Sequence, residues 1–279
     1  MISFPNAKIN IGLRVLHKRR DGFHELESIF YPVGVKDVLE IIESKELKFS
    51  SSGIAIPGNE SDNLCLKAYE LIRRDFDLPP VHIQLHKHIP IGAGLGGGSA
   101  DASFLIRLVN HKFKLEMDSV KMESIASELG SDCAFFIRNV PSYARGRGEV
   151  LDPIELDLGN YNLVLVMPQV HVSTADAFRG IIPGEPSHNL LDLIRKPVED
   201  WKDLILNDFE GSVLKKYPQI QTIKSALYDA GAVYASMSGS GAAVYGIFND
   251  DVCLPDLEDS NRIFYRLGNV NTEMGTITA

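Results

Sequence analysis

The sequence contains few cysteines. Among its 279 residues there are three, Cys65, Cys133 and Cys253, which are far apart and have no C-x-x-C spacing. A disulfide framework needs paired cysteines and a zinc site needs closely spaced ligands, so neither is indicated. This cysteine content is typical of a reducing compartment, and we expect a cytoplasmic protein.

The sequence also lacks an excess of basic residues and any long hydrophobic run. Its formal net charge at pH 7 is −9, whereas general binding to nucleic acid or to an anionic membrane requires a basic surface. The longest apolar stretches, such as LVLVM at 163–167, are far shorter than the roughly 20 residues that span a bilayer. The first ten residues have no secretion-signal pattern. We therefore expect neither nucleic acid nor a membrane as a partner.

Enough apolar sequence is present for two domains, since 44% of the residues are hydrophobic and the length suits two ordinary folding units. No internal repeat is visible. Strand and helix patterns are mixed without regular alternation, which predicts an α+β fold. The pattern restarts after RGRGEVLDPI at 145–154, so we place a domain boundary near residue 155.

Residues 7–16 alternate between apolar and polar side chains. Ile9 and Ile11 point to one face, and Lys8 and Asn10 point to the other, which predicts a half-buried strand. Asp21-Gly22 then predicts a hairpin turn before a second strand. From the strand alone, the polar face could be an ordinary solvated surface or could gather Lys8 and Asn10 in one functional patch.

A glycine-rich stretch, PIGAGLGGGSADAS at 90–103, follows a second alternating strand at 81–89 and precedes a helix that begins near Ser99. Glycines at a helix start let anion oxygens approach the backbone N–H groups, and the helix dipole favours negative charge. The stretch therefore predicts phosphate binding, with a flexible turn as the alternative. A Rossmann loop is excluded because helical sequence occupies the place of the second strand, and a Walker A loop is excluded because no lysine precedes Ser99.

The glycine stretch resembles the ATP-binding motif of the GHMP kinases. The resemblance implies a two-domain kinase with its active site in the cleft between the domains, and it implies ATP and Mg²⁺, the metal being held in part by the Ser99 hydroxyl. It implies that the following residues wrap the triphosphate: Pro90, Ile91, Gly92, Ala93, Gly94, Leu95, Gly96, Gly97, Gly98, Ser99 and Ala100.

Four further segments narrow the resemblance to one branch of these kinases. Residues 5–33, 129–137, 172–178 and 236–248 are similar, in this order, to motifs of the 4-diphosphocytidyl-2-C-methyl-D-erythritol kinases. The resemblance implies ATP-dependent phosphorylation of the 2-hydroxyl of 4-diphosphocytidyl-2-C-methyl-D-erythritol, a step of non-mevalonate isoprenoid precursor synthesis. The alternatives are another small-molecule GHMP kinase, of the homoserine or mevalonate type, and an inactive binding protein that kept the fold.

The resemblance also implies the domains and the catalytic residues. An N-terminal ATP-binding domain covers 1–155, and a ferredoxin-like C-terminal domain covers 156–279. Lys8 stabilises charge on the transferred phosphoryl group, and Asp132 accepts or orients the proton of the attacking hydroxyl. From the residues alone, Asp132 could equally be an acid that caps the following helix.

Substrate binding is assigned in the same way. The resemblance implies contacts to the substrate from Asn10, Phe23, His24, Thr174 and Phe178, with His24 and Phe178 on the two sides of the cytosine ring. In isolation, His24 would be a solvated turn residue and Phe178 a core residue. Phe23 stands where the family commonly has tyrosine.

Other positions carry weaker assignments. The adenine base is expected near Asn63, Leu64 and Lys87, and the turn at 238–241 is expected to shape the substrate phosphate region or to be a simple tight turn. Arg145 and Arg147, which differ from the family's usual side chains, receive no role, and the sequence predicts no oligomeric state.

Overall fold

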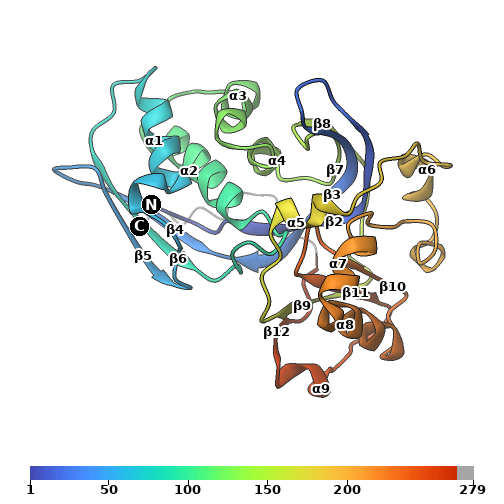
Figure 1. Cartoon of the computed structure of the whole chain (residues 1–279). Helices are drawn as coiled ribbons and strands as arrows, with labels where there is room; N and C mark the ends of the chain where they lie inside the picture. The colour runs from blue at the N-terminus through green and yellow to red at the C-terminus, as the bar shows by residue number, and fades with distance from the viewer. Residues whose placement is uncertain (269–279) are drawn as a thin grey trace.

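The computed structural model describes residues 1–268 and builds them into three four-stranded sheets with helices packed on two of them (Figure 1). The first sheet has the order β1-β4-β6-β5, and only the β5–β6 pair is parallel. Its strands are β1 Ile2–Ser3, β4 Val38–Glu43, β5 Lys48–Gly53 and β6 Val81–Lys87.

Four helices cover one face of this first sheet (Figure 1). They are α1 Leu64–Arg73, α2 Gly97–Phe113, α3 Ser119–Leu129 and α4 Cys133–Arg138. Ile41 and Ile83 of the sheet pack in one buried cluster with Ile72 of α1 and Ile106 of α2. This cluster fixes the start of α2, and hence the end of the glycine loop, against β6.

The second sheet contains the predicted hairpin, which is confirmed. It is antiparallel throughout, in the order β2-β3-β7-β8, and its strands are β2 Asn6–Lys18, β3 His24–Lys36, β7 Ser142–Gly146 and β8 Val150–Pro153. The prediction that the first strand is half-buried is wrong, because both faces of β2 are covered. Lys8 and Asn10 on its polar face are only 4% and 3% exposed.

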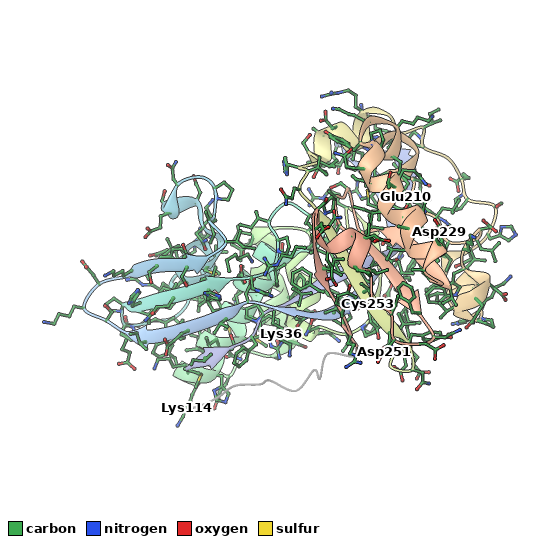
Figure 2. The ribbon with its side chains drawn as sticks, turned by 90° about the horizontal axis from the view of Figure 1, so that it is seen from below. Lys36, Lys114, Glu210, Asp229, Asp251 and Cys253 are labelled. Carbon is green, nitrogen blue, oxygen red and sulfur yellow. The ribbon has the colours of Figure 1, made fainter. Side chains whose placement is uncertain are left out.

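The third sheet lies in the C-terminal half and has the order β10-β11-β9-β12. It consists of β9 Asn162–Pro168, β10 Tyr234–Met237, β11 Val244–Phe248 and β12 Asn261–Phe264. Helices α7 Glu210–Lys216 and α8 Pro218–Asp229 pack against it. Seen from below, the two halves lie side by side, with Glu210 and Asp229 on one and Lys114 on the other (Figure 2).

The β2–β3 hairpin joins the two halves. Ile9 and Ile29 of the hairpin belong to one buried cluster with Leu165 of β9, Tyr245 of β11 and Trp201. The strands before residue 155 lie in the first two sheets, and those after it lie in the third. The α+β prediction is therefore confirmed, whereas the boundary near residue 155 stays a prediction.

The start of α1 depends on which of three neighbouring capping residues the backbone selects. Ser61 and Asp62 are suitable residue types, but both lie in a short 3₁₀ turn, Glu60–Asp62. The cap is Asn63, whose side chain accepts a hydrogen bond from the Cys65 N–H at 2.8 Å. Within residues 1–268, no helix is long and apolar enough to cross a membrane.

Candidate active site

The glycine loop connects β6 to α2, as the sequence predicted, and α2 begins at Gly97. At Gly94 the backbone has φ +77°, and a Cβ there would overlap with the carbonyl oxygen of Ser238 in the second glycine turn. At Gly98 a Cβ would meet only Leu64 Cδ1 at 3.9 Å. The missing side chain at Gly94 therefore lets two turns of this chain approach each other, while Gly98 faces open space.

Lys8 is held beside this loop by its own strand. Its backbone N–H donates to the Leu95 carbonyl at 3.0 Å, which ties β2 to the glycine loop. Its Nζ lies 3.3 Å from Asp132 Oδ2, donates to Asn10 Oδ1, and lies 4.5 Å from the centre of the Phe30 ring. A buried ammonium group is thus positioned by one carboxylate, one amide and one aromatic face.

Asn10 links β2 to both glycine turns. Its Nδ2 donates to Ser28 Oγ at 2.9 Å, and its backbone N–H donates to Ser238 Oγ at 3.2 Å. The Ser238 hydroxyl in turn donates to the Gly94 carbonyl at 2.9 Å. The interpretation of this strand face as solvated is therefore wrong.

Asp132 precedes α4 and occupies its N-cap position. Its side chain makes no capping hydrogen bond, and its carboxylate instead faces the Lys8 ammonium. The side chain is 30% exposed, so an entering molecule can reach it. The alternative of a capping acid accounts for its position in the chain but not for the direction of its side chain.

Lys8 and Asp132 face a cavity of about 640 Å³. Many of the residues selected from the sequence line it: Lys8, Asn10, Phe23, His24, Gly92, Gly94, Gly96, Asp132, Thr174 and Phe178. The second glycine turn contributes Gly239 and Ser240, and Thr174 Oγ1 lies 3.4 Å from Ser240 Oγ. The structure therefore brings the two glycine turns, the ion pair and the aromatic side chains to one place.

Other loop residues are placed differently. The side chains of Ala93, Leu95 and Ala100 are buried in the core, so any contact from them to a nucleotide comes from the backbone. Ser99 lies in the first turn of α2 and lines neither this cavity nor the one described next.

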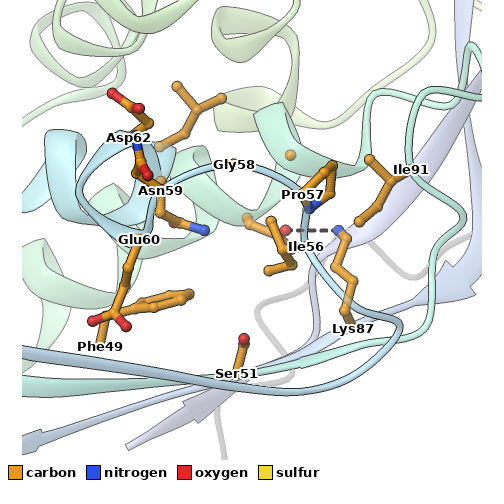
Figure 3. Close-up of a pocket in the computed structure, with 14 residues that line it drawn as sticks. Phe49, Ser51, Ile56, Pro57, Gly58, Asn59, Glu60, Asp62, Lys87 and Ile91 are labelled. Atoms are coloured by element: carbon orange, nitrogen blue, oxygen red, sulfur yellow. Dashed lines mark hydrogen bonds and ion pairs between the residues drawn. The ribbon is translucent and has the colours of Figure 1, made fainter.

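A second cavity of about 390 Å³ lies on the other side of the loop (Figure 3). It is lined by Asn63, Leu64 and Lys87, the three residues expected near the adenine base, and by Ile91 and Gly98 of the glycine loop. The loop therefore separates two cavities, and its residues contribute to both.

The Lys87 ammonium group is already occupied by two buried carboxylates that the sequence analysis missed. Its Nζ donates to Asp101 Oδ2 at 2.7 Å and to Asp37 Oδ2, and the other oxygen of Asp37 accepts the Ile89 N–H at 2.8 Å. Asp101 Oδ1 has no hydrogen-bond partner within residues 1–268. Burial outweighs the attraction of Lys87 and raises the pKa of Asp101 to about 8.

Asp101→Asn is expected to flatten the dependence of stability on pH. The raised pKa means that the folded chain holds a proton that the unfolded chain loses near pH 4. This group therefore lowers the free energy of unfolding as the pH rises above about 4, where the unfolded chain loses the proton that the folded chain keeps. Urea unfolding at pH 5, 6.5 and 8 measures the effect, and exposed Asp152→Asn is the control. An unchanged slope in Asp101→Asn would contradict the assignment.

Three aromatic side chains form one wall of the larger cavity. The His24 and Phe178 rings stack on each other, with centroids 5.0 Å apart and planes 20° apart. A base between them requires a separation of roughly 7 Å, twice a carbon contact distance. The expected placement of cytosine between these two rings therefore needs one ring to move. Phe23 is 54% exposed, and the Arg147 guanidinium lies 4.9 Å from its ring centre.

Comparisons with known proteins identify the family to which this chain belongs. The model of the GHMP kinases N terminal domain matches residues 63–139, and that of the GHMP kinases C terminal region matches residues 190–270. A 4-diphosphocytidyl-2-C-methyl-D-erythritol kinase of Bacteroides fragilis is 52% identical over 255 residues, which cover 90% of this chain and 93% of that protein. This chain belongs to the 4-diphosphocytidyl-2-C-methyl-D-erythritol kinase family.

Solved structures agree with this family. A crystal structure of 4-(cytidine 5'-diphospho)-2C-methyl-D-erythritol kinase superposes with a TM-score of 0.83 at 28% identity, over 97% of this chain and all of that one. A homoserine kinase from Cytophaga hutchinsonii has a TM-score of 0.67 at 19% identity, over 96% of this chain and 95% of that one, and shows a shared fold. The GHMP architecture predicted from the sequence is confirmed, and the chain is an ATP-dependent phosphotransferase.

Proposed function

We propose that this member of the 4-diphosphocytidyl-2-C-methyl-D-erythritol kinase family transfers the γ-phosphoryl group of ATP to the 2-hydroxyl of 4-diphosphocytidyl-2-C-methyl-D-erythritol, a step of non-mevalonate isoprenoid precursor synthesis. The observation that carries the proposal is the Lys8–Asp132 pair, 3.3 Å apart and lining a cavity beside a glycine loop and an aromatic wall. The names of the similar proteins support the choice of substrate.

The ion pair suits phosphoryl transfer. The acceptor oxygen forms a bond to the γ-phosphorus, the bond from that phosphorus to the β-bridging oxygen breaks, and ADP leaves with the electron pair of the broken bond. The Asp132 carboxylate accepts the proton of the hydroxyl, and the Lys8 ammonium stabilises charge on the phosphoryl oxygens. Because Lys8 is only 4% exposed, its charge acts with little screening by water.

ATP spans the glycine loop in this proposal. The loop amides and the N-terminus of α2 hold the triphosphate, and the base enters the second cavity beside Asn63 and Leu64. Since the Lys87 ammonium is held by Asp37 and Asp101, Lys87 contributes its backbone and aliphatic stem to this cavity rather than its charge. The proposal therefore includes no ionic contact between the Lys87 ammonium group and the nucleotide.

We propose that Mg²⁺ is bound together with ATP at the glycine loop. Magnesium in kinases usually keeps several waters and takes one or two protein oxygens together with the phosphates of the nucleotide. The Ser99 hydroxyl, in the first turn of α2, would be one such ligand. When bound, the metal neutralises charge on the phosphates, and the residues of this chain carry out the proton transfer.

The substrate is tested by an assay of ADP release with three acceptors. Phosphorylation of the cytidyl substrate, with homoserine and mevalonate turned over at least about 100-fold less efficiently, supports the proposal. Efficient turnover of homoserine or mevalonate would reassign the chain to another GHMP activity, and the absence of turnover with every acceptor would support the inactive binding protein. The three acceptors are compared by kcat/KM, because the ratio of these values measures how well one enzyme discriminates between substrates.

His24→Ala is expected to raise the KM of the cytidyl substrate about fivefold and to leave the KM of ATP within about twofold, because a lost ring contact is worth about 1 kcal/mol. Phe178→Ala should act in the same direction. The control is His82→Ala, since His82 lies outside both cavities and contacts Ser50 at 2.8 Å. Equal small effects on both KM values would count against the cytidine assignment.

The domain limits and the location of the protein remain proposals of the same kind. We propose an ATP-binding domain over 1–155 and a ferredoxin-like domain over 156–279, which the change of sheet after residue 155 supports. We also propose a cytoplasmic location. The free thiols of Cys65, Cys133 and Cys253 support it, because they suit a reducing compartment.

A further inference from the structure

Arg147 lines the larger cavity, although the sequence assigned it no role. It lies between Gly146 and Gly148, in the turn that joins β7 to β8. Its backbone N–H donates to Glu149 Oε2 at 2.5 Å, which holds the turn in place. Its guanidinium lies over the ring of Phe23, 4.9 Å from the ring centre. The side chain is 43% exposed and can be reached from the cavity.

The charges around the cavity leave Arg147 available for an anion. Its charged lining residues, histidines aside, are Lys8, Asp132 and Arg147. Lys8 is engaged by Asp132. Arg147 forms an ion pair with Glu149, from Nε to Oε1 at 3.5 Å, and lies close enough to Asp21 to interact with its charge, but its two Nη groups make no hydrogen bond within residues 1–268. The planar guanidinium therefore presents unused donors, which match phosphate oxygens in pairs.

Strand register places Arg147 towards the aromatic end of the cavity. Alternate residues of β3, namely His24, Leu26, Ser28 and Phe30, line the cavity along a length of about 20 Å. His24 marks the aromatic end, and Phe30 lies under the Lys8 ammonium at the reactive end. Gly146 pairs with Leu26, so the next residue, Arg147, stands beside the part of β3 nearer to the aromatic end.

We infer that Arg147 binds the diphosphate of the phosphoryl acceptor. This inference rests on the proposed function, since that acceptor carries a diphosphate between its cytidine group and the alcohol that is phosphorylated. With the base on the aromatic wall and the hydroxyl at Asp132, the diphosphate extends from the aromatic end towards the middle of the cavity. The guanidinium of Arg147, whose face packs on Phe23 at the aromatic end, meets the part of the diphosphate nearer to the cytidine group.

The test measures the binding of CDP and of cytidine by calorimetry, with a non-hydrolysable ATP analogue present so that the nucleotide site is filled. Arg147→Gln is expected to weaken CDP binding about ten- to a hundredfold, because a charge-assisted contact is lost, and to change cytidine binding by less than about twofold. The KM of the cytidyl substrate should rise in parallel, with the KM of ATP within about twofold. Arg147→Lys should retain part of the CDP affinity.

Arg145→Gln is the matched control. Arg145 is 46% exposed, forms an ion pair with Asp152 at 2.5 Å and lines neither cavity. The control should bind CDP as the wild-type protein does. An Arg147→Gln protein that also binds CDP like the wild type overturns the inference. Equal weakening of CDP and cytidine overturns it too, because that result makes Arg147 a support for the Phe23 ring.

Failure of the proposed function gives a different result. In that case the wild-type protein itself would neither bind CDP nor phosphorylate the cytidyl substrate, whatever stands at position 147. Failure of the inference alone leaves both properties of the wild type intact and removes only the effect of Arg147→Gln on CDP binding.

Discussion

Asp132→Asn is expected to lower kcat by about 10²- to 10⁴-fold, the range usually supplied by a positioned general base. Asparagine keeps the size of the side chain but cannot take up the proton of the attacking hydroxyl. It also removes the negative charge that lies 3.3 Å from the Lys8 ammonium. Steady-state kinetics give kcat, and the dissociation constant of ATP should stay within about threefold, because Asp132 contacts neither the base cavity nor the loop amides that hold the triphosphate in this proposal.

The matched control for this variant is Asp152→Asn. Asp152 is exposed, pairs with Arg145 and lies outside both cavities, so its replacement should leave kcat within about twofold. Far-UV circular dichroism and thermal unfolding check that both variants are folded. If Asp132→Asn turned over at the wild-type rate, the aspartate would have no part in proton transfer, and the mechanism proposed here would be wrong.

Gly94→Ala is expected to lower the free energy of unfolding by about 2–5 kcal/mol, since strain from a left-handed backbone and overpacking add at this position. Gly94 has φ +77°, and its new Cβ would overlap with the Ser238 carbonyl oxygen. The Ser238 hydroxyl also hydrogen-bonds to the Gly94 carbonyl, so a displacement here moves both glycine turns. Urea unfolding without nucleotide measures the loss, and kcat should fall with it.

Gly98 lies four residues after Gly94, and Gly98→Ala is expected to affect ligand binding without affecting packing. Its Cβ would meet only Leu64 Cδ1 at 3.9 Å, and its backbone is not left-handed. Within α2, alanine is favoured over glycine, so stability should be unchanged or higher by up to about 1 kcal/mol. The affinity for ATP should fall if the triphosphate lies over this residue. Equal stability losses in the two variants would contradict the assigned contact between the glycine turns.

The local elements could be predicted well from the sequence. The alternation of residues 7–16 predicted a strand, and Asp21-Gly22 predicted the hairpin turn that follows it. The order of strand, glycine loop and helix around residues 90–103 was also correct. The cap of α1 is not specified by the sequence, because Ser61, Asp62 and Asn63 are all good capping residues and only the path of the backbone selects among them.

The site could be predicted only in part. The motifs selected Lys8 and Asp132, but nothing in either segment showed that the Asp132 side chain faces Lys8 instead of capping α4. The partners of Lys87 were missed, because Asp37 lies directly before a different strand and has no motif of its own. The sequence showed Arg147 between two glycines but gave it no role. Only the pairing of β3 with β7 shows that it lies beside the cavity.

The sequence by itself determined the strands, the helices and the glycine turns, because these depend on side-chain periodicity and turn chemistry between near neighbours. The family followed from the resemblance of its motifs. Only the tertiary structure decided which charges meet and which polar faces are buried. Lys8 and Asn10 alternate like solvated residues, yet side chains of β3, Asp132 and the two glycine turns cover them. The pairing of Lys87 with Asp37 and Asp101 likewise depends on which strands and helices are neighbours in space. Burial and ion pairing depend on contacts between distant segments, and local sequence patterns do not specify those contacts.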